Sequence, residues 1–295
     1  MLPDTPTQED VLAELVAWGE AEDEIRTLVL TSTRAQEDDS ADALSDYDLI
    51  VAVRDPDGFV AREGWVGARG PKLVSWSDED ELLGERTTFR GVVYPDGVRV
   101  DFTIWPAVLL ERIADADAVP DDLDLGFRIL LDKDGSTARW GTPTYRAHIP
   151  KPPTQAEFEA IVDEFWWSTT YVAKALWRGE VVFAEFVLDQ DMRLGALRRV
   201  LEWRIELDHD WSLLPGVYGR KLERRLPPDL AAELHATYVG ADIEENWDAL
   251  FLTTVLFRRV ATEVAAALGY RYPIEVDEGV TAQLEAVRAM PPPNA

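Results

Sequence analysis

The chain has 295 residues, a net charge of −27, a hydrophobic fraction of 46% and no cysteine. The charge argues against binding to nucleic acid or to an anionic membrane surface, because both are negatively charged themselves. Without cysteine there can be no disulfide, thiolate metal site or cysteine nucleophile. The sequence contains no run of 18 or more apolar residues, so we expect no transmembrane helix. The N-terminus lacks the basic and apolar regions of a signal peptide, and we therefore expect a cytoplasmic protein.

The acidity has two explanations. A strongly negative surface attracts cations, which indicates a cationic substrate or partner. The second explanation is a generally acidic proteome from a GC-rich or salt-loving host, which the preference for arginine over lysine fits equally well. Lysine occurs only at positions 72, 133, 151, 174 and 221.

The first half of the chain alternates short strand and helix patterns. Apolar spacing predicts a helix over residues 8–20 and strands over 25–30 and 46–53. Residues 92–94 and 98–105 flank Pro95-Asp96-Gly97, which is a hairpin signal. A short helix over 59–70 and strands over 72–76 and 128–131 complete the expected set.

The second half is helical. Prolines between 143 and 153 indicate a linker, and Thr154 with Glu157 forms a capping-box signature. We therefore predict an α+β protein with a mixed sheet flanked by helices over residues 1–150, followed by a helical bundle over 151–295. The expected helices of the bundle are 154–178, 180–188, 191–210, 228–238, 244–268 and 277–289.

Three aspartates lie in the predicted strands. Asp46 and Asp48 are two residues apart, so their side chains point to the same face. Asp101 joins them if its strand is a neighbour. Three carboxylates on one patch repel one another unless a cation lies between them. Mg²⁺ suits such oxygen ligands and usually brings substrate phosphates with it, which indicates nucleotide chemistry.

A hydroxyl-rich turn precedes the first aspartates. Ser32 and Thr33 follow the strand over 25–30, and Arg34 adds a cation. Backbone N–H and side-chain O–H groups in such a turn can bind phosphate oxygens, although many Ser/Thr turns bind nothing.

This order of motifs resembles the polymerase-β-type nucleotidyltransferases, in which a Gly-Ser turn precedes Asp-x-Asp and a third carboxylate follows on a neighbouring strand. Ser32-Thr33 stands at the Gly-Ser position, and the Cβ of Ser32 could crowd phosphates or oppose a positive φ. The second half resembles the aminoglycoside 6-adenylyltransferases, which modify streptomycin. The segments that carry this resemblance are 164–178, 201–203, 246–251, 256–258 and 268–273, within a similarity that extends from about residue 8 to 290.

The resemblance implies a catalytic Mg-ATP domain over 1–150 and a substrate-binding domain over 151–295. It implies transfer of AMP from ATP to a hydroxyl of an aminoglycoside, streptomycin in particular, and hence antibiotic resistance. We expect a monomer or a homodimer. Asp46 and Asp48 would bind Mg²⁺, and Asp101 would act as general base or third metal ligand. Two alternatives remain: a nucleotidyltransferase with a different small-molecule acceptor, and a homologue that binds nucleotide without turnover.

Three further cations are candidate nucleotide ligands. Lys174 is the only lysine of the long helix over 154–178, and a surface ion pair is its alternative role. Arg220 and Lys221 follow glycines 216 and 219, where a glycine-capped helix start is the alternative.

Substrate-binding candidates lie in the helical half. Trp166 could stack on a cationic sugar, but it is adjacent to Trp167 and the two cannot share a helix face, so at least one belongs to the core. Glu185 and Asp189 are candidate carboxylates for such a substrate, with ordinary helix surface charge as their alternative.

Overall fold

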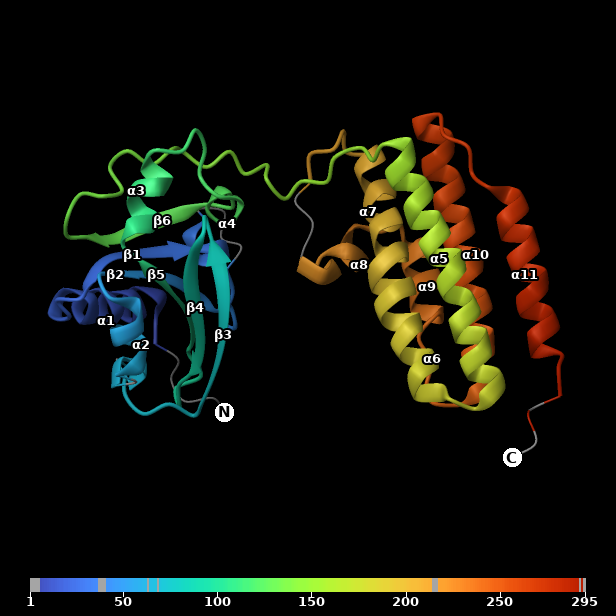
Figure 1. Ribbon diagram of the computed structural model, residues 1–295, viewed down its shortest axis with the longest axis horizontal. Coiled ribbons are helices and arrows are strands. Elements are labelled where there is room, and N and C mark those ends of the chain that lie inside the picture. Colours follow the sequence, from blue (N-terminus) through green and yellow to red (C-terminus); the bar gives the residue numbers. More distant parts are fainter. Residues whose placement is uncertain are drawn as a thin grey trace. The chain divides into compact units, whose positions relative to one another are not determined.

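The computed structural model divides the chain into two compact units, Met1–His148 and Ile149–Ala295, and each has its own hydrophobic core (Figure 1). It describes residues 6–36, 41–62, 64–67, 69–213, 217–291 and 293. A mixed sheet followed by helices confirms the predicted α+β class. Among these described residues, no helix is long and apolar enough to cross a membrane.

The first unit is built on a six-stranded sheet in the order β3-β4-β5-β2-β1-β6. β2 and β5 run parallel, and the other neighbouring pairs are antiparallel. The parallel pair lies at the centre of the sheet, and its side chains are buried in a hydrophobic cluster on each face. The strands are β1 (Ile25–Thr31), β2 (Tyr47–Val53), β3 (Val74–Leu82), β4 (Glu85–Val93), β5 (Arg99–Pro106) and β6 (Phe127–Asp132).

Helices cover both faces of this sheet (Figure 1). Leu49 and Val51 of β2 pack with α1 (Gln8–Ala21) and α2 (Pro56–Ala61) on one face. The intervening Ile50 and Ala52 pack on the other face, against α3 (Val108–Ala114). Even-numbered residues of β2 therefore point to the α3 face, as side-chain alternation requires. The short helices η2 (Gly64–Gly67) and α4 (Asp121–Asp124) complete the two layers.

Three expectations for this unit are corrected. The strand expected over 92–94 is the end of a longer strand that begins at Glu85. The helix expected over 59–70 begins at Pro56, because Asp55 accepts a hydrogen bond from the Gly58 N–H at 3.0 Å and caps it, and it ends at Ala61. The strand expected over 72–76 extends to Leu82 through four acidic residues. Their side chains are exposed on an edge strand, where charge is tolerated and opposes edge-to-edge association.

The second unit consists of helices. The capping box of Thr154 and Glu157 is present and starts the first of them. The two helices expected over 180–188 and 191–210 are instead continuous, because a π-helical segment joins them without a turn. The elements are α5 (Gln155–Arg178), α6 (Val181–Val187), the π-helix η3 (Leu188–Leu197), α7 (Arg198–Leu207), η4 (Val217–Gly219), α8 (Leu222–Arg225), α9 (Pro228–Ala236), α10 (Ile243–Leu268) and α11 (Ile274–Arg288).

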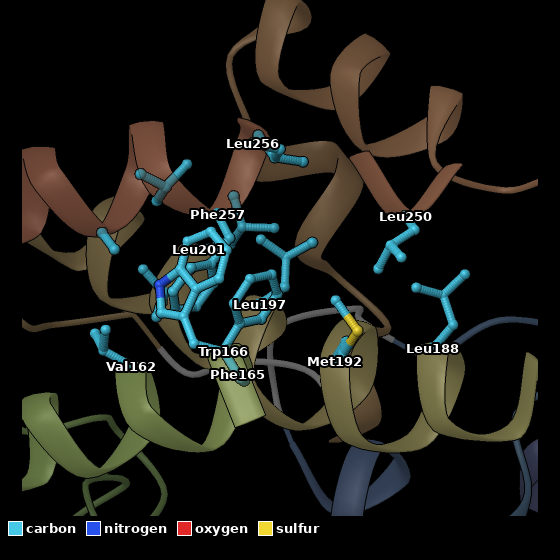
Figure 2. Packing of buried hydrophobic residues seen from close by; sticks show 14 of the residues in the cluster. Val162, Phe165, Trp166, Leu188, Met192, Leu197, Leu201, Leu250, Leu256 and Phe257 are labelled. Carbon is cyan, nitrogen blue, oxygen red and sulfur yellow. The ribbon is translucent and has the colours of Figure 1, made fainter. Parts of the chain in front are cut away.

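Aromatic packing holds α5 against α10 (Figure 2). The rings of Phe165 and Phe257 stack with centroids 3.6 Å apart. Trp166 lies beside them with 1% of its surface exposed, and its indole N–H donates to the Tyr272 hydroxyl at 3.2 Å. Trp166 is therefore part of the core and anchors the segment that leads into α11.

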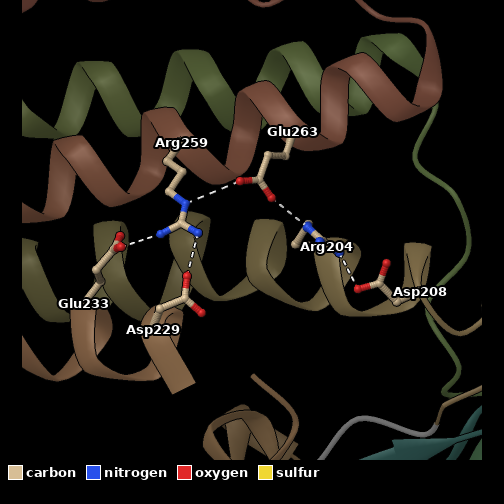
Figure 3. Close-up of polar contacts among 6 residues, drawn as sticks. All are labelled: Arg204, Asp208, Asp229, Glu233, Arg259 and Glu263. Atoms are coloured by element: carbon tan, nitrogen blue, oxygen red, sulfur yellow. Dashed lines mark hydrogen bonds and ion pairs between the residues drawn. The ribbon is translucent and has the colours of Figure 1, made fainter. Parts of the chain in front are cut away.

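An ion-pair network links α7, α9 and α10 at the surface of this unit (Figure 3). Glu263 accepts from Arg204 at 2.7 Å and from Arg259 at 3.3 Å. Arg259 also contacts Asp229 at 2.7 Å, and Arg204 contacts Asp208 at 2.6 Å. Glu233 is a further partner of Arg259. Single exposed pairs contribute little to stability, but a shared network fixes how neighbouring helices align.

Candidate active site

The structure brings the three aspartates to one face of the sheet. β2 and β5 pair in parallel with Asp48 directly opposite Asp101. Asp46 is two residues before Asp48, so it belongs to the same face, which is the face covered by α3. The hairpin between β4 and β5 is present as predicted, with Gly97 at φ 85°, and it sets the register of β5.

Crowding of negative charge changes the acidity of Asp48. Burial, followed by the charges of Asp101 and Asp46, raises the pKa of Asp48 from 3.8 to about 6. A hydrogen bond with the Ser32 side chain and the charge of Arg99 oppose this rise. The side chain is therefore held in a place where its ionised form needs a cation.

Arg99 supplies positive charge to this cluster, and sequence reasoning missed it. Its Nε donates to Asp101 Oδ1 at 2.9 Å and its Nη2 donates to Asp101 Oδ2 at 2.8 Å. Its Nη1 also lies 3.6 Å from Asp46 Oδ2. Arg99 is two residues before Asp101 on the same strand, and this spacing is the sequence signal that could have identified it.

The turn after β1 reaches the cluster through Ser32. Ser32 starts the 3₁₀-helix η1 (Ser32–Ala35) with φ 58°, a left-handed conformation that is unfavourable for a residue with a Cβ. The sequence resemblance raised the question of whether serine could adopt a positive φ at this position, and here it does. Its hydroxyl interacts with the Asp48 carboxylate, which ties the turn to the aspartates.

Arg34 makes contacts within the first unit that the sequence did not predict. Its guanidinium donates to the Ser45 carbonyl at 2.7 Å and to Gln8 Oε1 at 2.9 Å, and it lies 4.1 Å from the centroid of the Tyr47 ring. These contacts join η1 to α1 and to the start of β2. Arg34 thus holds these segments together, and its contact with nucleotide stays a prediction.

Replacing Ser32 with glycine and with alanine separates backbone strain from the hydroxyl contact. Both changes remove the hydroxyl, but only glycine relieves the left-handed backbone. We expect the Ser32→Gly protein to have a free energy of unfolding about 1 kcal/mol higher than that of Ser32→Ala. Urea denaturation of both variants measures this difference, and equal stability would show that the turn carries no strain.

A small cavity within the first unit adjoins Asp46. It has a volume of about 250 Å³ and is lined by Arg34, Asp46 and Arg99, together with the hairpin residues Gly97 and Val98. This cavity gives the Arg99 side chain, which is 47% exposed, room to move.

Gly91 on β4 is the register partner of Asp101 on β5, and its lack of a side chain makes room for the Asp101 carboxylate. A Cβ at Gly91 would lie 3.1 Å from Asp101 Oδ1 and 3.3 Å from the Phe89 ring. Glycine inside a strand often marks such a close approach, so this position also had a sequence signal.

The Gly91→Ala change should therefore displace the Asp101 carboxylate by a few tenths of an ångström. We expect the nucleotidyl transfer that the sequence resemblance implies to slow about tenfold, because Asp101 has the implied role of general base and small misplacements of such a group are costly. Gly279→Ala is the matched control, since nothing lies within 4 Å of its added Cβ. Steady-state kinetics of both variants test this, and an unaltered rate in Gly91→Ala would contradict it.

The other predicted nucleotide ligands lie in the second unit. Lys174 is exposed on α5 and stacks on Tyr171, with its Nζ 4.5 Å from the ring centroid. Arg220 and Lys221 are exposed between η4 and α8. Gly216, which we grouped with them, lies outside the described residues. Their role toward nucleotide stays a prediction.

The predicted substrate residues behave differently from one another. The expectation that Trp166 stacks on substrate is corrected, because its ring is buried in the core, whereas Trp167 is 65% exposed. Glu185 and Asp189 flank the buried guanidinium of Arg193, at 3.6 Å and 2.6 Å. Both carboxylates remain partly exposed, so their contact with a substrate stays a prediction.

The donor set fits Mg²⁺ through two carboxylates rather than three. Within the described ranges, no group of three or more acidic or histidine residues is placed to hold a metal ion, and Asp101 is engaged by Arg99. Mg²⁺ is commonly bound by one or two carboxylates plus substrate phosphates. Asp46 and Asp48 meet this requirement, because they are two carboxylates close enough for the charge of Asp46 to raise the pKa of Asp48.

A hydroxyl turn beside aspartates on two paired parallel strands is the arrangement expected of a nucleotidyltransferase domain. Comparison with known proteins agrees: residues 5–287 match the streptomycin adenylyltransferase family, and the chain belongs to this family.

Individual relatives span nearly the whole chain. Aminoglycoside 6-adenylyltransferase of Bacillus subtilis (strain 168) is 31% identical over 271 residues, covering 90% of this chain and 92% of the relative. The protein of the same description from Campylobacter jejuni is 27% identical over 271 residues, covering 91% of each. The crystal structure of an aminoglycoside 6-adenyltransferase from Bacillus subtilis has a TM-score of 0.48 at 25% identity, covering 97% of this chain and 100% of that one.

Proposed function

We propose that the protein is a Mg²⁺-dependent adenylyltransferase that transfers AMP from ATP to a hydroxyl of an aminoglycoside, with streptomycin as the first candidate. The observation that carries this proposal is the register of Asp48 opposite Asp101, with Asp46 on the same face, in a member of the streptomycin adenylyltransferase family. Adenylyl transfer needs charge neutralised at the α-phosphate and a base near the acceptor hydroxyl, and this cluster offers groups for both tasks.

Asp46 and Asp48 are the residues that would hold Mg²⁺. When bound, the ion would neutralise negative charge on the phosphates of ATP. Ser32 and Thr33 begin a short helix next to Asp48, so their hydroxyl and backbone N–H groups are the nearest candidates to bind phosphate oxygens.

Asp101 is the proposed general base. Its carboxylate would take the proton from the acceptor hydroxyl as that oxygen attacks the α-phosphorus and pyrophosphate leaves. In this structure the carboxylate accepts two hydrogen bonds from Arg99, and Gly91 leaves the space that the carboxylate occupies. A fixed position for this carboxylate is what makes it effective in proton transfer.

The acceptor is inferred from charge and from the relatives. A net charge of −27 attracts a polycationic aminoglycoside and repels nucleic acid. The relatives described above are named aminoglycoside 6-adenylyltransferases. Adenylylation would add a bulky anionic group to the drug, and antibiotic resistance would follow.

Pyrophosphate release from Mg-ATP tests the proposal, with streptomycin beside a panel of other aminoglycosides. We expect release with streptomycin in the wild type and none in the Asp46→Asn variant. Release with another acceptor alone would favour a nucleotidyltransferase of different specificity. Binding of Mg-ATP without release under any condition would favour a nucleotide-binding homologue without turnover.

A further inference from the structure

Arg99 contacts Asp46, a metal ligand in the proposed function, and Asp101, the general base in the proposed function. Its guanidinium donates to both oxygens of Asp101 and lies 3.6 Å from Asp46. Arg99 is thus within ion-pair distance of two of the three aspartates. One side chain thus neutralises part of the same cluster that a divalent cation would neutralise.

The guanidinium and a divalent cation are competitors for this cluster. A cation held by Asp46 and Asp48 would be close to a positive group that is 3.6 Å from one of these carboxylates. Like charges at such distances repel strongly in a partly buried site. The Asp101 side chain is 10% exposed, whereas Arg99 is 47% exposed beside the 250 Å³ cavity, so Arg99 is the member of the pair that has room to move.

We propose that Arg99 is a built-in counter-cation that weakens binding of a divalent cation to the Asp46–Asp48–Asp101 cluster. This inference rests on the metal site of the proposed function. Its consequence is that a cation alone binds poorly, while a cation that arrives with a nucleotide finds a second partner for the guanidinium. Arginine suits this exchange, because its planar fork binds carboxylate and phosphate oxygens with the same bidentate geometry.

Titration with Mn²⁺ alone, followed by the electron paramagnetic resonance signal of the free ion, tests this on the full chain without nucleotide. We expect Arg99→Gln, which removes the charge but keeps a hydrogen-bonding side chain, to bind Mn²⁺ about tenfold more tightly than the wild type. Arg99→Ala should behave in the same way, and Arg99→Lys, which keeps the charge, should remain within about twofold of the wild type.

Arg86→Gln is the matched control for net charge. Arg86 is on the neighbouring strand β4 and forms ion pairs with Asp57 and Glu79, away from the three aspartates. It should leave the Mn²⁺ affinity within about twofold of the wild type. Circular dichroism spectra of all variants check that each variant is folded before its Mn²⁺ affinity is compared with that of the wild type.

Unchanged or weaker Mn²⁺ binding in folded Arg99→Gln would overturn the inference. The Asp48→Asn variant separates this failure from failure of the metal site. If the wild type binds Mn²⁺ in a manner that Asp48→Asn abolishes, while Arg99→Gln changes nothing, only the role of Arg99 is overturned. If Asp48→Asn binds Mn²⁺ as well as the wild type does, the metal site and the inference fail together.

Discussion

The Asp48→Asn variant is expected to lose nucleotidyl transfer by roughly a thousandfold and to be more stable than the wild type at neutral pH. The loss follows from removing a proposed metal ligand at the centre of the cluster. The gain follows from removing a carboxylate that burial and two neighbouring aspartates keep from ionising easily. Activity and stability should therefore change in opposite directions.

The pH dependence of this gain has a definite sign. The pKa of Asp48 is about 6 in the folded protein and 3.8 as its ordinary value, so the folded state binds the proton more tightly. Its contribution is fully favourable below about pH 4 and is lost as the pH rises through 6. The asparagine side chain of the variant has no such titration, so the variant should exceed the wild type by about 1–3 kcal/mol at pH 7 and show little of this advantage near pH 4.

Chemical denaturation of the metal-free proteins at pH 4 and pH 7 measures this difference. Addition of Mg²⁺ together with ATP provides the control, since the pair should stabilise the wild type more than it stabilises Asp48→Asn. A variant that is less stable than the wild type at pH 7, or that gains equally at both pH values, would contradict the electrostatic account of this side chain.

The Trp166→Ala variant is expected to lose about 3–5 kcal/mol of unfolding free energy. Trp166 is 1% exposed, packs edge-on against Phe165 at a centroid distance of 5.4 Å, and donates to the Tyr272 hydroxyl. Truncation would leave a cavity in the core of the second unit and an unpaired hydroxyl acceptor on Tyr272. A loss of this size is a large part of the total stability of a domain.

Trp167→Ala is the matched control, because the same residue type at the next position is 65% exposed. Its expected cost is within about 0.5 kcal/mol of zero. Equilibrium unfolding followed by circular dichroism measures both variants. Similar costs for the two tryptophans would show that the face of α5 that packs inward has been assigned incorrectly.

The strands and their carboxylates could be predicted from the sequence because their patterns are local. Alternation of apolar residues identified β2 and β5, and Pro95-Asp96-Gly97 identified the hairpin. Period-two spacing then placed Asp46 and Asp48 together. The parallel pairing of Asp48 with Asp101 is a non-local contact, and the resemblance to nucleotidyltransferases made it an expectation.

The hydrogen-bond partners of Arg34 and Arg99 could not be predicted in the same way. Arg99 and Arg34 have similar local contexts, as single cations near strand ends. One binds the carboxylate cluster, and the other binds carbonyls and an aromatic ring. Spacing places Arg99 and Asp101 on one face of β5, but a long, flexible side chain has several possible partners, and only the folded sheet shows which of them it binds.

The helical half shows a related limit. Helical spacing predicted α5, but Trp166 and Trp167 are about 100° apart on an ideal helix, and both fit an amphipathic pattern near its boundary. The burial of Trp166 follows from contacts with α10 and Tyr272, which are distant in sequence. Likewise, the π-helix at Leu188–Leu197 keeps continuous the two helices that we predicted separately over 180–188 and 191–210.

Mass spectrometry of streptomycin after incubation with the protein, ATP and Mg²⁺ tests the central claim most directly. The account predicts a drug that carries one added adenylyl group when the wild type is present, and unmodified drug when Asp48→Asn replaces it. Unmodified streptomycin and unmodified related aminoglycosides, in the presence of folded wild-type protein that binds Mg-ATP, would contradict it.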